Sequence, residues 1–584
     1  MKLKKNFYVI VLLLLFIFVS LTNYQVLKKD TIPLLHEPAE FYMRSLRFFV
    51  QVNEIFGKEG DSGEKFNTLF LDLVGDQKGT TIIFFTYPFY KFLGVSDDSA
   101  IMTNTVFLLV LIFSVYGIGA ALHSKKAGVL AAIICVLFPI VYAASRTFIP
   151  LFALAAMTTL NIFLLIKTQE FTNRKYSILL GISMVLSFFT RPAFSVFIIA
   201  PFLVTMLFII KNYKNENIKI QIINMGLMFL TFFALLSVKF LNFRDTSIYL
   251  GLQINTFLIS IHTIINQGFY NDITLNTVWL NSTYLLGVFF AVLFFISLLF
   301  MFIFKTKKKL FLLSWLFFPI AFLLVHYLSQ FGALHYMFIK QIIVVIPAVA
   351  IIIALFLIKI GEFDFAKLFY RIVKIKKSRR KKATQIIKRF QIMLSVVIIF
   401  LVILVGLVGL IFTSFICKDG LNCPQKKPFA VDIDVDNWVG KFYPRKLQWN
   451  PDEILALLGE SNDGVRIFLF DRISSSSWIL KLKAYEKKLS GDSYNYDFVS
   501  CSNTKADGGG EVVIWMSLKD CVELIESCDW VLKDLFFRID TYLVNPEERK
   551  KTYDLWETDI KNEFSLAQTF NDSYSQKVEL YKKI

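Results

Sequence analysis

Two neighbouring residues near the N-terminus, His36 and Glu37, could carry out proton-transfer chemistry. They lie between the first apolar run of the chain and a segment that begins at Pro38. A positioned carboxylate can accept a proton from a reacting hydroxyl, and an imidazole beside it can act as a second base or a relay. Two structural roles stay open beside these: Glu37 as the N-cap of a helix that starts at Pro38, and His36 as an exposed loop residue.

Further acidic residues follow in the same polar stretch. Glu40 lies one helical turn before Arg44, a spacing that favours an ordinary ion pair on a helix surface. Asp72 and Asp76 border the other end of the stretch and would form either a second acidic element or solvated loop acids. We favour solvation for Asp76 and keep Asp72 as a candidate for chemistry.

Cationic residues beside apolar runs could bind an anion. Arg146 and Arg191 stand at run ends that the charge pattern assigns to the outer side of a membrane, and His335 with Lys340 closes a similar rim. Such cations can neutralise a phosphate, with snorkelling to the interface as the alternative for the arginines. No His, Cys and Glu spacing indicates a metal site, so neither a metal nor another cofactor is supported.

The composition excludes an ordinary soluble domain. The 584 residues are 55% hydrophobic and 18% charged, they include 63 phenylalanines, and the mean hydropathy is +0.57. The net charge of +18 divides unevenly, because residues 418–584 hold 23 Lys and Arg against 28 Asp and Glu. The basic excess therefore lies between apolar runs, as the positive-inside rule produces, and we expect no nucleic-acid partner.

Eleven apolar runs of about twenty residues predict an α-helical polytopic membrane bundle. The first, Phe7–Leu21, follows three lysines and lacks a small-residue cleavage site, so we expect an uncleaved anchor helix with a cytoplasmic N-terminus. The other ten lie near residues 101–122, 127–144, 150–167, 176–190, 193–210, 220–241, 278–304, 310–328, 340–358 and 391–416.

Basic clusters predict the sidedness of the bundle. With the N-terminus inside, every cluster falls in a loop on the cytoplasmic side, and the odd number of runs places residues 417–584 outside. We therefore expect a multi-pass protein of the plasma (inner) membrane. The 359–390 loop could also bind anionic membrane lipid, although a topology-fixing role is favoured. The clusters are Lys125-Lys126, Lys167 with Arg174-Lys175, Lys211/Lys214/Lys219, Lys305/Lys307/Lys308/Lys309 and the segment 359–390.

Two outer loops, 28–100 and 242–277, are large enough to house a site. The first outer loop, 28–100, belongs to a transmembrane domain over 1–416; it contains an amphipathic helix at 38–56 and an interfacial segment at 81–93. Residues 417–584 are expected to form a soluble α/β domain. We predict its helices at 451–460, 477–489 and 518–527, its strands at 465–470, 511–516 and 530–532, a turn at Asp507–Gly510 and a disulfide between Cys417 and Cys423.

The order of these features resembles the integral-membrane (type C) glycosyltransferases over roughly residues 30–350. The similar branch is the RgtA/B/C/D-like group, related to aminoarabinose transferases and protein O-mannosyltransferases. Local motifs carry the resemblance in the same order as in the family. They are Tyr87–Ser99 with its Leu93-Gly94, Lys125–Gly128, Ser145-Arg146, Gly181 with Phe189–Pro192, and His335-Tyr336 followed by Pro347.

The resemblance implies transfer of a sugar from a polyprenyl-phosphate donor to a lipid, glycan or protein acceptor on the extracytoplasmic face. The reaction would be an inverting hexosyl or pentosyl transfer with general-base catalysis, and the lipid-linked sugar would be a substrate rather than a cofactor. The implied catalytic residues are Glu37, His36 and Asp72. The implied donor phosphate-binding residues are Lys78, Arg146, Arg191 and His335.

The sequence also departs from the family pattern. His36-Glu37 stands where the family has Asp-Glu, Lys78-Gly79-Thr80 replaces a Lys-Pro-Pro-like segment, and His335 replaces an arginine. The first departure keeps a non-catalytic cell-envelope assembly protein open as an alternative. A transporter or lipid flippase is the other alternative, although the chain shows no internal repeat and its polar residues gather at the outer ends of the runs.

Overall fold

The computed structural model describes residues 2–30, 36–57, 79–211, 217–240, 286–303, 309–329, 341–362, 380–411, 413–414 and 451–458, and seven further segments of the C-terminal part. Those seven segments are 461–469, 494–499, 502–507, 510–515, 527–534, 564–571 and 577–584. The expected disulfide cysteines Cys417 and Cys423 lie outside these residues, as do the expected helix at 477–489 and residues 518–526 of the expected helix at 518–527.

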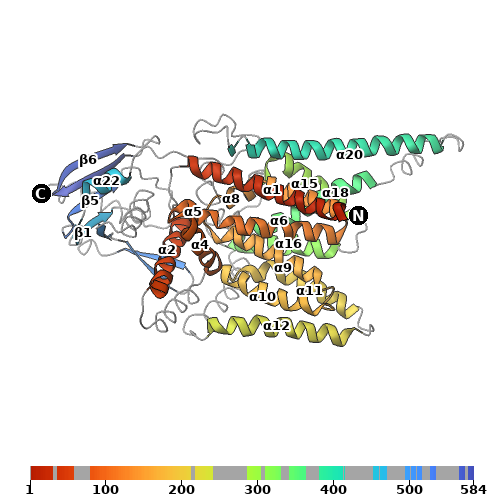
Figure 1. The fold of residues 1–584 in the computed structure, drawn as a ribbon, viewed down its shortest axis with the longest axis horizontal. Coiled ribbons are helices and arrows are strands. Elements are labelled where there is room, and N and C mark those ends of the chain that lie inside the picture. The colour runs from red at the N-terminus through yellow and green to blue at the C-terminus, as the bar shows by residue number, and fades with distance from the viewer. Residues whose placement is uncertain are drawn as a thin grey trace.

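Each of the eleven apolar runs contains a helix in the described residues. They pack side by side along the long axis of the molecule (Figure 1). The helices are α1 (Lys2–Lys29), α6 (Asn104–Leu122), α7 (Lys125–Leu137) with α8 (Pro139–Ser145), α9 (Pro150–Lys167), α10 (Arg174–Thr190), α11 (Phe194–Lys211), α12 (Ile218–Phe240), α15 (Val288–Ile303), α16 (Lys309–Ser329), η1 (Ile343–Val345) with α18 (Ile346–Glu362), and α20 (Arg380–Ile411).

Seven helices of the described chain are long and apolar enough to cross a membrane, or eight if α7 and α8 form one span bent by 67°. The bend follows from Pro139, which has no N–H to donate and keeps the preceding Phe138 in an extended conformation. Apolar helices within α15 and α16 are shorter. The chain is thus a multi-pass membrane protein, and the number of eleven spans stays a prediction.

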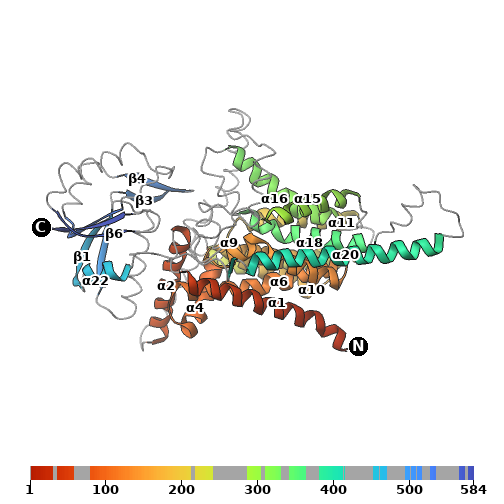
Figure 2. The same cartoon turned by 90° about the horizontal axis from the view of Figure 1, so that it is seen from above.

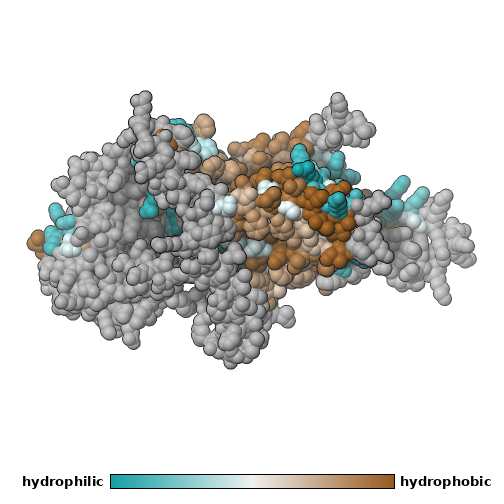
Figure 3. All heavy atoms as spheres, turned by 90° about the horizontal axis from the view of Figure 1, so that it is seen from below, coloured by the Kyte–Doolittle hydropathy of each residue, from teal (hydrophilic) through white to brown (hydrophobic). Residues whose placement is uncertain are grey.

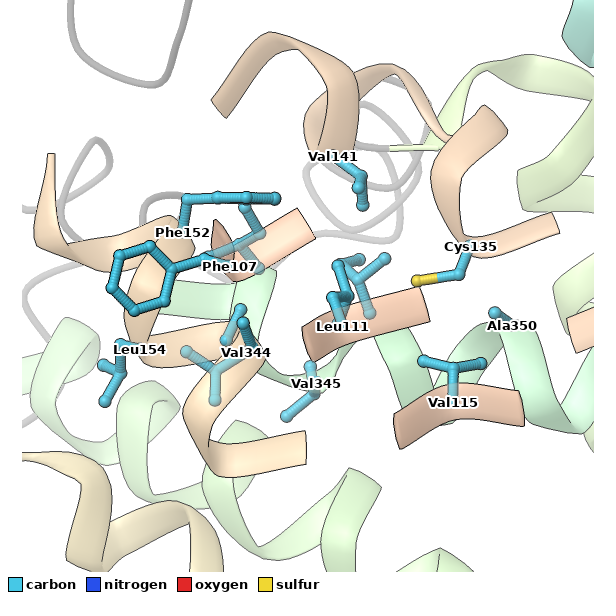
Figure 4. Packing of buried hydrophobic residues seen from close by; sticks show 14 of the residues in the cluster. Phe107, Leu111, Val115, Cys135, Val141, Phe152, Leu154, Val344, Val345 and Ala350 are labelled. Atoms are coloured by element: carbon cyan, nitrogen blue, oxygen red, sulfur yellow. The ribbon is translucent and has the colours of Figure 1, made fainter. Parts of the chain in front are cut away.

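Helix α6 lies at the centre of the bundle and packs against α7 and α9. Gly119 of α6 and Gly128 of α7 permit the close approach, because a Cβ on Gly119 would lie 2.7 Å from the Gly128 Cα. Figure 4 shows Phe107, Leu111 and Val115 of α6 beside side chains of neighbouring helices. Outward-facing leucines and phenylalanines cover the bundle, and hydrophilic residues gather toward the end that holds the N-terminus (Figure 3).

The first outer loop supplies three helices at the opposite end of the bundle, which we call the loop end. They are α2 (His36–Gly57), α4 (Thr80–Leu93) and α5 (Asp97–Met102). Helix α2 runs across the direction of α1 in both ribbon views (Figures 1 and 2). The predicted helix at 38–56 is confirmed and begins two residues earlier, and the 81–93 segment forms α4.

The C-terminal part combines one helix with two sheets. Helix α22 (Pro451–Leu458) precedes a mixed sheet of strand order β2-β1-β5-β7-β6. Strand β1 is parallel to its neighbours β2 and β5, and strand β7 is antiparallel to its neighbours β5 and β6. Its strands are β1 (Ser461–Leu469), β2 (Tyr494–Val499), β5 (Trp530–Asp534), β6 (Phe564–Asn571) and β7 (Lys577–Lys583). The remaining strands, β3 (Ser502–Asp507) and β4 (Gly510–Trp515), form a hairpin whose Asp507 pairs with Gly510.

The sequence predicts several elements of the C-terminal part and misses others. The helix at 451–460 and the strands at 465–470, 511–516 and 530–532 correspond to α22, β1, β4 and β5. The turn at Asp507–Gly510 joins two paired strands, as expected. The sequence did not predict β2, β3, β6 or β7. The division into domains at residue 416 stays a prediction.

Candidate active site at the loop end of the bundle

Gly79 lies where several helices of the loop end contact one another. Its N–H donates to the Thr190 carbonyl over 3.0 Å, and Thr81 Oγ1 donates to the Leu186 carbonyl over 2.7 Å. These two bonds fasten the start of α4 to the end of α10. Gly79 has a φ of +83°, in the left-handed region that favours glycine.

Packing around Gly79 also leaves no space for a side chain. A Cβ at this position would lie 2.5 Å from the Phe41 ring of α2 and 3.2 Å from Pro150 at the start of α9. Helices α2, α4, α9 and α10 therefore meet within one side chain of Gly79. This glycine directly follows Lys78 in the chain, and Thr190 directly precedes Arg191.

Helix α2 is held against α4 by buried aromatic and hydroxyl groups. Ser45 and Tyr90 share a hydrogen bond of 2.6 Å between their oxygens, and Ser45 also donates to the Tyr42 carbonyl over 2.7 Å. The rings of Tyr42 and Phe49 lie 6.4 and 5.5 Å from the Tyr90 ring, in edge-to-face arrangements. Because edge-to-face pairs add to the energy of apolar burial, this contact fixes the orientation of α2 across the loop end.

The proton-transfer candidates lie at the start of α2. His36 and Glu37 form the first turn of the helix, so Glu37 is inside α2 and is not the N-cap of a helix starting at Pro38. Glu40 forms the expected ion pair with Arg44, at 2.6 Å, which confirms the surface-pair interpretation.

Arg191 ends α10 at the loop end. It has an extended backbone, its N–H donates to the Ser187 carbonyl over 2.9 Å, and Pro192 follows it. Its side chain is half-buried. Within the described part of the chain, no side chain forms a hydrogen bond or an ion pair with its guanidinium. Arg191 could therefore receive an anion.

Arg146 lies at the end of α8 and is fully buried. Its Nε donates to Asn23 Oδ1 over 2.9 Å, and one terminal nitrogen donates to Ser414 Oγ over 2.7 Å. The guanidinium also lies 4.8 Å from the centre of the Tyr142 ring. Burial among these groups shows that Arg146 does not snorkel to the membrane surface.

The remaining sequence-predicted site residues fall outside the described part of the chain. They are Asp72, Lys78, His335 and Lys340. No group of three or more His, Cys, Asp and Glu that could hold a metal ion occurs among the residues that the structure describes.

The residues that organise this end of the bundle do not stand out in the sequence. Gly79 appears there only as part of a departure from a family motif, and Asn23, Asn104 and Ser414 belong to no motif. The three polar residues share one signal, which is a side chain capable of hydrogen bonding at the end of a long apolar run. Such a group must find a partner when it is buried in the membrane.

Comparisons with known proteins agree with this architecture. Residues 78–238 match a family model described as dolichyl-phosphate-mannose-protein mannosyltransferase. No curated protein matches the chain in sequence. The chain is similar to the crystal structure of ArnT from Cupriavidus metallidurans bound to undecaprenyl phosphate, at a TM-score of 0.50 and 13% identity, over 97% of both chains.

A second similar structure is the apo form of the Archaeoglobus fulgidus oligosaccharyltransferase. The TM-score is 0.51 at 12% identity, and the match covers 91% of this chain and 70% of the other. At such low identity the likeness establishes the fold. The resemblance to the type C glycosyltransferases is confirmed at that level.

Proposed function

We propose that the chain is a membrane glycosyltransferase that moves a sugar from a polyprenyl-phosphate donor to a lipid, glycan or protein acceptor at the loop end. The observation that carries the proposal is the Gly79–Thr190 backbone hydrogen bond, at 3.0 Å. It joins the chain neighbours of Lys78 and Arg191, and all four residues fall in the segment that matches the mannosyltransferase family. A lysine and an arginine at these two chain positions would suit a phosphate.

The position of Glu37 on α2 supports its role as the base. Residues four apart share a face of a helix, so the Glu37 position lies on the same face as Phe41. The Phe41 ring packs against Gly79. The start of α2 is therefore set beside the proposed phosphate site. The similar ArnT structure, which is bound to undecaprenyl phosphate, supports a lipid of this class as the donor.

The reaction follows from these roles. The Glu37 carboxylate takes the proton of the acceptor hydroxyl. At the same time the oxygen of that hydroxyl forms a bond to the anomeric carbon of the sugar. The bond from that carbon to the phosphate oxygen breaks on the opposite face, which inverts the configuration. The polyprenyl phosphate leaves with the electron pair, and Lys78, Arg191 and His335 stabilise its charge. His36 and Asp72 would assist the base.

Two features limit the proposed set of groups. Arg146 already forms hydrogen bonds to Asn23 and Ser414, so we leave it out of the phosphate site. The proposal invokes no metal and no other cofactor, because the lipid-linked sugar is itself the activated substrate. The reaction would take place on the extracytoplasmic face of the plasma membrane.

A transfer assay in liposomes tests the proposal. Purified protein is supplied with undecaprenyl phosphate carrying a radiolabelled sugar, together with membrane lipids and proteins as acceptors. We expect a labelled acceptor and an equal amount of released polyprenyl phosphate. Movement of the labelled donor across the bilayer without a labelled acceptor would identify a flippase instead. Neither process would favour a non-catalytic assembly protein.

A further inference from the structure

Arg146 is the centre of a buried polar cluster that joins four segments of the chain. Asn23 of α1 accepts from its Nε, and Asn23 Nδ2 in turn donates to Ser145 Oγ over 2.8 Å. Asn104 of α6 donates from Nδ2 to the carbonyls of Ser145, over 3.2 Å, and Thr147, over 2.7 Å. The cluster thus fixes the end of α8 to both α1 and α6.

The fourth segment is the end of α20. Ser414 lies just beyond this helix, accepts from Arg146 and donates to the Leu410 carbonyl over 2.6 Å. Asn23, Arg146 and Ser414 are all buried. One guanidinium therefore bridges the first and last helices of the bundle, whose ends lie side by side in both ribbon views (Figures 1 and 2).

The two bridged helices lead to the two large parts that extend beyond the loop end. Helix α1 leads to α2 and its Glu37, and α20 leads to the C-terminal part. In the described residues α1 also packs against α5, α6, α7 and α8. The position of α1 relative to α20 therefore influences the positions of the first outer loop and the C-terminal part.

Arginine suits this role for a physical reason. Its planar guanidinium donates hydrogen bonds in several directions at fixed angles, whereas lysine presents a compact ammonium. Removing one partner of a buried charge leaves it without compensation, which costs more than the bond itself contributes. Substitution of Arg146, Asn23 or Ser414 should consequently lower the stability of the cluster.

We infer that Arg146 is a positioning residue that ties α1 to the end of α20, and through them sets the first outer loop and the C-terminal part relative to one another. It would not be a ligand of the donor phosphate. Only the kinetic part of its test rests on the proposed function.

The test combines stability with kinetics in the full-length protein. Arg146→Met should lower the unfolding temperature in detergent relative to Arg174→Met, which changes an exposed arginine at the opposite end of the bundle. In liposomes kcat should fall by about 10²-fold, as for displaced catalytic groups, while the donor KM changes by less than about twofold. A raised donor KM with unchanged kcat and unfolding temperature would overturn the inference.

A double-mutant cycle gives a second readout that needs no transferase activity. Asn23→Leu and Arg146→Met should together cost less stability than the sum of the two, because each removes the same tie. Additive losses would contradict the tie. If Arg146→Met does not fold, Arg146→Lys and Ser414→Ala replace the pair. If the wild-type protein shows no transferase activity, the proposed function is refuted. The double-mutant cycle then still tests whether Arg146 ties α1 to the end of α20.

Discussion

Gly79 combines two constraints that act on a single residue. Its positive φ would strain any other residue, and its Cβ position is filled by Phe41 and Pro150. Gly79→Ala should therefore cost the backbone strain, about 1–2 kcal/mol, and in addition displace α2 or α9. We expect a lower unfolding temperature in detergent and a large loss of transfer, because α2 carries Glu37.

Gly94 provides a control for backbone strain without a clash. It has a φ of +86° and a ψ of 164°, a region that essentially only glycine adopts, and a Cβ there would meet no atom within 4 Å. Gly94→Ala should therefore cost at least as much backbone strain as Gly79→Ala and yet keep most of the transfer activity. An equal loss of transfer in the two variants would contradict the packing role of Gly79.

Single residues also show what local sequence can predict. The Glu40–Arg44 pair followed from its spacing, since both partners lie on one helix. The partners of Arg146 come from residues more than a hundred positions away in sequence. Their pairing depends on how helices pack, which no local pattern specifies. For the same reason the position of Gly79 beside Thr190 could not be predicted.

At the scale of elements, the contact between α2 and α4 positions the start of α2. Tyr90→Phe removes the hydroxyl that is hydrogen-bonded to Ser45 and should cost about 1 kcal/mol, the typical value for a buried hydrogen bond. Hydrogen exchange of the α2 amides should become faster, because the helix is less firmly held.

Tyr87→Phe is the control on the same helix. Its hydroxyl also reaches α2, where it donates to Asn53 Oδ1 over a longer 3.3 Å at a partly buried position. Because this bond is longer and less buried, the exchange of the α2 amides should rise less in this variant than in Tyr90→Phe. Unchanged exchange in Tyr90→Phe would show that ring packing alone holds α2 to α4.

The elements differ in how well periodicity predicted them. The apolar spacing between Pro38 and Phe56 predicted α2 because one face of a helix recurs at 3.6 residues. Strands β6 and β7 were missed, although they pair over their whole length. Each strand gains its stability from its partner, so a short segment carries a weak signal by itself.

At the scale of the whole molecule, two contacts join described helix ends that lie beside the predicted cytoplasmic loops. His123 at the end of α6 lies 3.1 Å from Glu362 at the end of α18, and Asn224 of α12 donates to the Phe171 carbonyl between α9 and α10. The basic clusters beside these contacts thus share the end opposite α2. The helix packing agrees with the charge pattern, which alone predicts which end faces the cytoplasm.

Reporter fusions test this orientation. A reporter active only in the cytoplasm should be silent after Ile584 and active after Lys376, because the C-terminal part is predicted outside and the 359–390 loop inside. Activity after Ile584 would reverse the orientation, and it would place the loop end and its candidate site in the cytoplasm.

Glu37→Gln in the liposome transfer assay tests the central claim most directly. Glutamine keeps the size of glutamate but cannot accept the acceptor proton, so transfer should fall by about 10²–10⁴-fold with normal protein levels. Glu40→Gln, which changes an acid one turn away in an ion pair with Arg44, should stay close to the wild-type rate. Near-normal transfer by the Glu37 variant would contradict the account and move the base to Asp72 or His36.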